Sequence, residues 1–123
     1  MGRLDQITNE GYKYLKNATT VNLSHSYNLI NENLSFLENA RNMDLSCCEN
    51  ITDEGLKYLK NATTVNLSDC KLITHEGLKY LKKGAIVNLY NCNLITDKRL
   101  KSLKNVKILN RRFESQRYVK IIK

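Results

Sequence analysis

The sequence predicts an α/β solenoid of about five 22-residue turns, and two observations lead to this prediction. First, shifting the sequence against itself by 22 residues aligns two sets of five aliphatic residues without a gap. One set is Ile7, Leu29, Ile51, Ile73 and Ile95, and the other is Leu15, Leu37, Leu59, Leu81 and Leu103. Second, the spacing of apolar residues within each turn changes from that of a strand to that of a helix. A repeat of 20–50 residues is typical of a chain that stacks one small unit many times.

Each turn is expected to contain one short strand. In residues 64–68, Val65 and Leu67 alternate with Thr64, Asn66 and Ser68, so the apolar pair faces the core and the polar residues face outward. The residues aligned with Val65 are Val21, Met43, Val87 and Leu109, and those aligned with Leu67 are Leu23, Leu45 and Leu89. We therefore expect the strands to lie side by side in one sheet.

A short helix of about two turns is expected between successive strands. Ile51, Leu56 and Leu59 recur at helical spacing, and Thr52 can cap the helix start. Acidic residues follow in the first turn and lysines in the last, which suits the helix dipole. One strand and helix cannot bury their own apolar face, so each turn is stable only when its neighbours stack on it.

Residues 65–74, followed by Glu76, Gly77 and Leu78, resemble the cysteine-containing leucine-rich repeats of F-box/leucine-rich-repeat ubiquitin-ligase receptors. The resemblance extends over about residues 4–110. It implies a leucine-rich-repeat solenoid, with short parallel strands on the concave face and short helices on the convex face. It also implies a protein-protein interaction module, acting as an adaptor or substrate receptor.

Three cysteines, Cys48, Cys70 and Cys92, lie one repeat apart, and Ser26 occupies the equivalent place in the first turn. Structural zinc needs about four ligands that converge on one ion, whereas this column spreads its thiols along the solenoid. We therefore expect no metal and no cofactor. The resemblance implies that each thiol forms a hydrogen bond with the backbone of a neighbouring loop, and Ser26 is expected to do the same. Cys47 lies outside the column and is expected to be an accessible thiol without an activating base.

The sequence shows no arrangement typical of an enzyme. His25 and His75 lie in different parts of the repeat, and there is no nucleophile with a base, no carboxylate pair and no glycine-rich phosphate loop. Gly11, Gly55 and Gly77 recur at the repeat period and are explained by helix geometry. We therefore expect a binding protein and no catalytic residues.

The outward strand positions form the candidate partner-binding surface. In columns they are Thr20, Asn42, Thr64 and Ile86, then Asn22, Asp44, Asn66 and Asn88, then Ser24, Ser46, Ser68 and Tyr90. Ile86 and Tyr90 are of the residue types that dominate binding energy at protein interfaces. We predict that a protein partner contacts Asn22, Asp44, Asn66, Ile86, Asn88 and Tyr90. The alternative interpretation is that short polar residues keep an exposed sheet soluble.

The charge is concentrated near the carboxyl terminus. The chain has a net charge of +8, and residues 98–123 contain ten basic residues with Glu114 as their single acid. The candidate basic patch combines this region with lysines that recur on the helices: Lys57, Lys79, Lys101, Lys104, Arg111, Arg112, Arg117 and Lys120. As an alternative to protein binding, this patch predicts binding of RNA, DNA or an acidic membrane. The alternative interpretation is a solvated surface.

We expect a single domain over residues 1–123, with a partial repeat at residues 1–20, repeats at residues 21–110 and a basic cap or tail at residues 111–123. The tail contains five large apolar residues and is expected to cover the last turn. The first turn lacks a strand, so its apolar end is expected to favour self-association. No apolar run is long enough to cross a membrane, and four cysteines without an evident disulfide framework favour the cytoplasm or nucleus.

Overall fold

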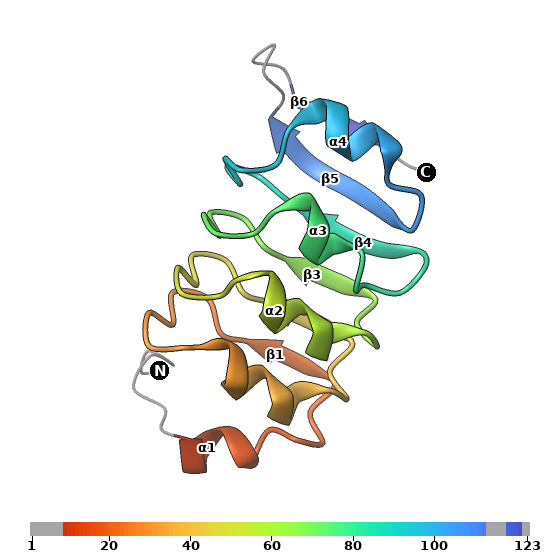
Figure 1. Ribbon diagram of the computed structural model, residues 1–123. Coiled ribbons are helices and arrows are strands. Elements are labelled where there is room, and N and C mark those ends of the chain that lie inside the picture. Colours follow the sequence, from red (N-terminus) through yellow and green to blue (C-terminus); the bar gives the residue numbers. More distant parts are fainter. Residues whose placement is uncertain (1–8, 113–117, 122–123) are drawn as a thin grey trace.

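The computed structural model describes residues 9–112 and 118–121, with side chains over residues 11–109. Six strands form one sheet in chain order, and the helices lie along one side of it (Figure 1). The parallel strands are β1 (Thr20–Asn22), β2 (Asn42–Asp44), β3 (Thr64–Asn66), β4 (Ala85–Asn88) and β5 (Val106–Arg112), and β6 (Tyr118–Ile121) is antiparallel to β5. The chain is therefore an α/β leucine-rich-repeat solenoid, as the sequence predicts.

Helical segments connect the strands on the convex side. They are α1 (Asn9–Lys13), η2 (Asn31–Leu37), α2 (Asp53–Leu56), η3 (Lys57–Leu59), α3 (His75–Leu78) and α4 (Asp97–Ser102). α2 runs directly into the 3-10 turn η3, which together give the expected length of about two turns. Among the residues that the structure describes, no helix is both long enough and apolar enough to cross a membrane.

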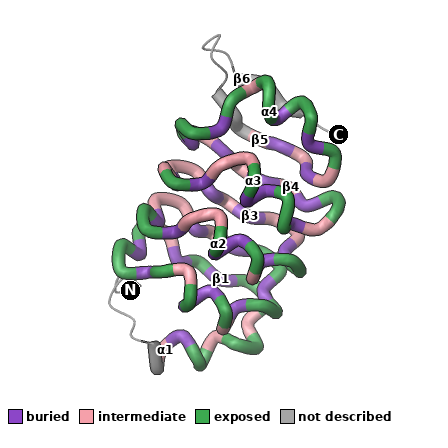
Figure 2. Tube along the Cα trace, in the orientation of Figure 1, coloured by how far each residue is buried: buried purple, intermediate pink, exposed green. Residues whose placement is uncertain are grey.

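One aliphatic core runs the length of the solenoid, visible as the buried segments along the inner sides of the turns (Figure 2). The strands contribute Val21, Met43, Val65, Val87 and Ile108, followed two residues later by Leu23, Leu45, Leu67 and Leu89. The helical segments from η2 onward add leucines, and Leu34, Leu56, Leu78 and Leu100 are all fully buried. Because every layer packs on the next, burial in one turn depends on its neighbours.

The last turn departs from the 22-residue register. Val87 of β4 lies opposite Ile108, and Asn88 lies opposite Leu109. Ile108 follows Leu103 by five residues, whereas Val87 follows Leu81 by six, so the last connection is one residue shorter. The prediction that Leu109 occupies the core column is therefore wrong. Ile108 is buried in the core column, and Leu109 faces the concave side of the sheet, away from the core.

Side chains from one helix start hold the start of the next. Asn31 accepts from the Thr52 N–H at 3.0 Å and donates to the Thr52 Oγ1 at 2.7 Å. Asp53 repeats the arrangement on Thr74, whose N–H lies 2.8 Å from the carboxylate. The expected cap by Thr52 is thus corrected: Thr52 stands at the N-cap position, but its side chain makes no cap hydrogen bond.

The repeated glycines leave room for these inter-turn side chains. A Cβ on Gly55 would lie 2.5 Å from the Asn31 Oδ1, and a Cβ on Gly77 would collide with the Asp53 carboxylate and lie 2.9 Å from Leu56. The glycines are therefore required by packing between turns, more than by the geometry of their own helices.

Part of the predicted tail belongs to the sheet. Arg111 and Arg112, expected at the start of the tail, are the last residues of β5. Residues 118–121 form β6, which pairs with β5 so that Ile121 lies opposite Ile108 and Tyr118 opposite Arg112. An antiparallel strand thus covers the edge that β5 would otherwise present to solvent.

Candidate functional site: the concave sheet face

The strands bring the predicted columns together in register. Thr20, Asn42, Thr64 and Ile86 pair in succession, and Asn22, Asp44, Asn66 and Asn88 form the next row along the strands. Pairing continues onto β5, where Ile86 meets Lys107 and Asn88 meets Leu109. Exposure falls along the solenoid: Asn22 is exposed, whereas Asp44, Asn66 and Asn88 are half-buried.

The asparagine row has a structural role at the ends of the strands. The side-chain oxygens of Asn22, Asp44, Asn66 and Asn88 each accept a hydrogen bond from the backbone N–H two residues later, at 2.9–3.0 Å. Such Asx turns stop a strand and redirect the chain. Directly after them come His25, Cys47, Asp69 and Asn91, each with a positive φ of 60–62°. These turns were not predicted, although the Asx-X-Ser spacing of the first three signals them.

An apolar patch lies on the concave face where β3, β4 and β5 meet. Ile86 and Leu109 are half-buried and line a shallow depression of about 240 Å³, together with Asn66 and Asn88. Met43, Val65 and Thr64 complete the lining. We call this the Ile86–Leu109 patch. Ile86 was predicted to belong to this surface, but Leu109 was not, because the one-residue shortening of the last connection is not visible in a strict 22-residue alignment.

The other end of the concave face is more polar. A second depression of about 300 Å³ is lined by side chains of β1 and β2 with one residue from β3: Thr20, Val21, Asn22, Asn42, Met43, Asp44 and Thr64. Its exposed side chains are mainly hydroxyls and amides. It therefore offers fewer apolar groups to a partner than the Ile86–Leu109 patch.

Tyr90 lies beyond the end of β4. It is half-buried, and its backbone joins the Asx turn of Asn88 and accepts a hydrogen bond from Asp69 N at 2.9 Å. Tyr90 is not among the residues that line the depression beside Ile86. The two predicted anchors are therefore separate: Ile86 lines the depression together with Leu109, and Tyr90 lies outside it, just beyond the end of β4.

The cysteine column forms hydrogen bonds inside the solenoid. The thiols of Cys48, Cys70 and Cys92 donate to the carbonyl oxygens of Leu23, Leu45 and Leu67, respectively, at 3.0–3.2 Å. Burial raises the pKa of the Cys48 thiol to about 11 and also raises the pKa of Cys70. These thiols are therefore protonated donors at neutral pH.

Ser26 occupies the place of the cysteines in the first turn. Its Oγ is buried and has no hydrogen-bond partner within the described part of the chain. By the repeat, the acceptor would be the carbonyl of Met1, which lies outside the described residues. Cys47 is half-buried, and its Sγ lies 3.8 Å from an Asp69 oxygen. Its pKa is raised, first by burial and then by the negative charge of Asp69, so this thiol is not activated for nucleophilic attack.

The candidate basic patch is divided between the convex side and the carboxyl-terminal strands. Lys57, Lys79, Lys101 and Lys104 are exposed on the convex side. Arg111 and Arg112 end β5, Lys120 is in β6, and Arg117 lies outside the described residues. The lysine stripe of Lys57, Lys79, Lys101 and Lys104 is therefore the part of the patch that shares one surface.

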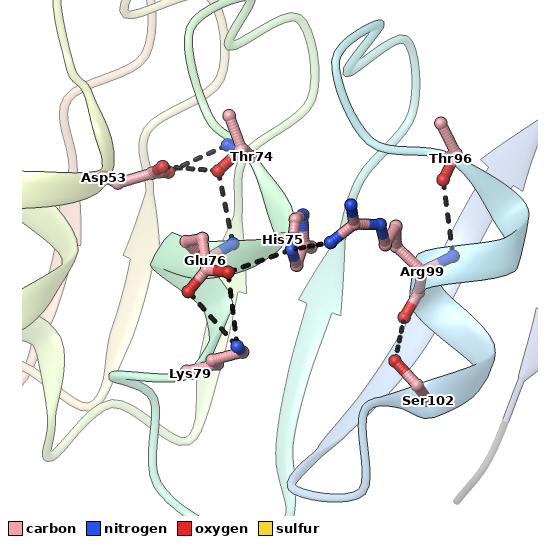
Figure 3. A network of polar contacts seen from close by, with 8 residues as sticks. All are labelled: Asp53, Thr74, His75, Glu76, Lys79, Thr96, Arg99 and Ser102. Atoms are coloured by element: carbon pink, nitrogen blue, oxygen red, sulfur yellow. Dashed lines mark hydrogen bonds and ion pairs between the residues drawn. The ribbon is translucent and has the colours of Figure 1, made fainter.

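Acidic neighbours reduce the net charge of this lysine stripe. Lys57 pairs with Glu54 at 3.4 Å, and Lys79 pairs with Glu76 at 3.1 Å. The hydrogen bond from Lys79 lowers the pKa of Glu76. Figure 3 shows that Glu76 also faces His75, whose Nε2 lies 3.1 Å from the carboxylate and 2.6 Å from the Arg99 guanidinium. Exposed pairs of this kind contribute little to stability.

Metal-binding side chains are dispersed in the structure. Within residues 9–112 and 118–121, no group of three or more His, Cys, Asp or Glu residues is arranged to hold an ion.

Comparisons with known proteins agree with this architecture. A family model described as a Leucine Rich repeat matches residues 43–60 and 63–82. A chain in the crystal structure of the Rad7 and Elc1 complex in yeast has a similar fold, with a TM-score of 0.63 and 16% sequence identity over 85% of this chain. This chain spans 30% of the length of that one. No curated protein sequence matches it. The five parallel strands and the matched repeats together show a leucine-rich-repeat fold.

Proposed function

We propose that this chain is a protein-binding module that recognises its partner with the Ile86–Leu109 patch and the adjoining Tyr90. The observation that carries the proposal is that Ile86 and Leu109, two half-buried aliphatic side chains, are diagonal neighbours across β4 and β5 and line one depression on an otherwise polar concave face. Partly exposed apolar groups surrounded by polar ones are typical of protein interfaces, where a few such anchors supply most of the binding energy. Asn66 and Asn88 border the patch, and Asn22 and Asp44 extend the proposed contact surface toward the first strand.

A finer role, as an adaptor or substrate receptor in ubiquitin transfer, rests on the resemblance of the cysteine-containing repeats. The similar chain of known structure comes from a complex of two proteins, which supports an assembly role for this architecture. We propose to test this role by probing purified ubiquitin-ligase scaffold subunits for binding to the wild-type chain. Binding that survives in the Ile86→Ser variant would indicate a second surface for the ligase, and no binding would remove the ubiquitin role while leaving protein recognition intact.

The experiment for the main proposal compares partners captured by the wild-type chain with those captured by a double variant, Ile86→Ser with Tyr90→Ala. Quantitative mass spectrometry should show a specific partner lost from the double variant. A matched control, Tyr80→Ala, removes an exposed aromatic side chain that lies outside the concave columns. Identical partner sets for the wild type and the double variant would remove the concave-face proposal.

A second candidate is anion binding by the lysine stripe with the basic carboxyl end. Its support is the exposure of Lys57, Lys79, Lys101 and Lys104, weakened by the pairing of two of them with glutamates. Binding of this kind must weaken steeply as salt rises, because it releases counterions. Titration of single-stranded polynucleotide or anionic vesicles at low and at physiological salt tests it. Absence of binding at low salt excludes this candidate.

A further inference from the structure

The Ile86–Leu109 patch also restricts the chemistry of the partner, if the proposed concave-face recognition holds. Its depression of about 240 Å³ is open on the solvent side and has Met43, Val65 and Leu109 among its lining residues. A space of this size accommodates one large aliphatic or aromatic side chain, since a benzene molecule fills an engineered cavity of about 150 Å³. A single projecting side chain on an extended segment fits it better than a broad apolar surface does.

The border of the depression favours an extended backbone. The Oδ1 atoms of Asn66 and Asn88 are already occupied by the N–H groups of Ser68 and Tyr90. These hydrogen bonds fix both side chains, and each amide nitrogen remains as a donor at the edge of the depression. No hydrogen bond from either nitrogen is present within the described part of the chain. Fixed amide donors suit the carbonyl oxygens of a peptide.

One cation lies beside the patch. Lys107 is paired with Ile86 across β4 and β5, and neighbouring strands are about 4.8 Å apart. Lys107 is half-buried, and it forms no ion pair with the side chains described over residues 11–109. The acid of the concave columns, Asp44, lies on β2 and receives hydrogen bonds from the Ser46 N–H and hydroxyl. The electrostatic preference next to Ile86 is therefore for a negative group.

We infer that the partner presents an extended segment in which a large apolar side chain lies next to a carboxylate, the apolar group entering the Ile86–Leu109 depression and the carboxylate pairing with Lys107. The inference rests on the proposed function, and it adds a charge requirement that protein binding alone does not make. Opposite charges set register and specificity in such an interface.

Selection from a phage-displayed library of random peptides on the full chain tests the inference. Enriched peptides should contain Asp or Glu adjacent to a large apolar residue. For one synthetic peptide of this type, Lys107→Glu should weaken binding by about tenfold or more. Replacing the acid of the peptide by Lys should restore binding to the Lys107→Glu protein. Lys83→Glu makes the same charge change at an exposed position before β4 and should leave binding unchanged.

The outcomes separate the inference from the proposed function. Peptides that lose binding in Ile86→Ser and Leu109→Ser, but bind Lys107→Glu as strongly as wild type, would overturn the charge requirement and leave concave-face recognition standing. Peptides unaffected by Ile86→Ser and Leu109→Ser would overturn both. Failure to enrich any peptide would overturn the extended-segment inference. Circular dichroism of every variant verifies that the fold is retained.

Discussion

Leu109 lies opposite Asn88 in the pairing of β4 with β5, so it faces the concave surface, while its neighbour Ile108 is fully buried opposite Val87. We predict that Ile108→Ala lowers the free energy of unfolding by about 2–5 kcal/mol, as expected for a cavity in a packed core. Leu109→Ala should cost less than about 1.5 kcal/mol, because its side chain is half-exposed. Urea unfolding of both variants measures the difference. A larger loss for Leu109→Ala would show that the strict 22-residue register is correct.

The register of β5 could not be predicted from the sequence alone. Over the described residues, the period correctly predicts the strands, the helical segments and the buried columns from Val21 to Leu103, because each layer repeats the same packing. At the last turn, Ile108 and Leu109 are adjacent aliphatic residues, and either one satisfies an alternating pattern. Only the path of the chain after Leu103, which is one residue shorter, decides between them.

Cys70 is expected to be replaceable by serine but less readily by alanine. A serine hydroxyl can still donate to the Leu45 carbonyl, so Cys70→Ser should be mildly destabilising and leave binding unchanged. Cys70→Ala removes one of the two hydrogen bonds to that carbonyl, which also accepts from the Cys48 N–H at 3.2 Å, at a cost of about 0.5–1.5 kcal/mol. Thermal unfolding of both variants measures the order. Equal losses would mean that the hydrogen bond contributes nothing, and stoichiometric zinc in the purified protein would contradict the account of this column.

The hydrogen bond expected of Ser26 involves the Met1 carbonyl, which lies outside the described residues. Sequence similarity groups Ser26 with Cys48, Cys70 and Cys92, but the hydrogen bond depends on a strand carbonyl one repeat earlier. The concave asparagines pose the same difficulty. Asn66 and Asn88 are outward-facing, as predicted, yet their oxygens serve Asx turns that the alternation of the strand does not reveal.

Gly77→Ala should destabilise the protein even though alanine favours helices. The new methyl group would collide with the Asp53 carboxylate and lie 2.9 Å from Leu56. We expect a loss of about 1–3 kcal/mol, as is usual when a methyl group is forced into a packed site. Combining Gly77→Ala with Asp53→Ala tests the cause by denaturant unfolding. The two losses should be less than additive, because the second change removes the obstructing side chain. Strict additivity would place the cost elsewhere.

Deletion of residues 112–123 should lower the unfolding temperature and promote aggregation without any partner present. The deletion removes β6 and exposes the edge of β5. Differential scanning calorimetry and light scattering provide the two measurements. A charge-matched control retains the full length and replaces Arg117, Lys120 and Lys123 by Gln, which removes the same net charge of three as the deletion and separates the loss of the strand from the loss of basic charge. A truncated protein that stays monomeric with an unchanged melting temperature would show that residues 112–123 do not stabilise the solenoid.

Photo-crosslinking from defined positions tests concave-face recognition most directly. A photoreactive amino acid is introduced at Leu109 in one variant and at Tyr80, which is 44% exposed, in another. Both are exposed to whole-cell extract and irradiated, and the crosslinked proteins are identified by mass spectrometry. We predict one dominant protein crosslinked from Leu109 and absent from Tyr80, with its yield reduced when Ile86→Ser is added. The same protein crosslinked only from Tyr80, or equally from both positions, would contradict recognition through the Ile86–Leu109 patch.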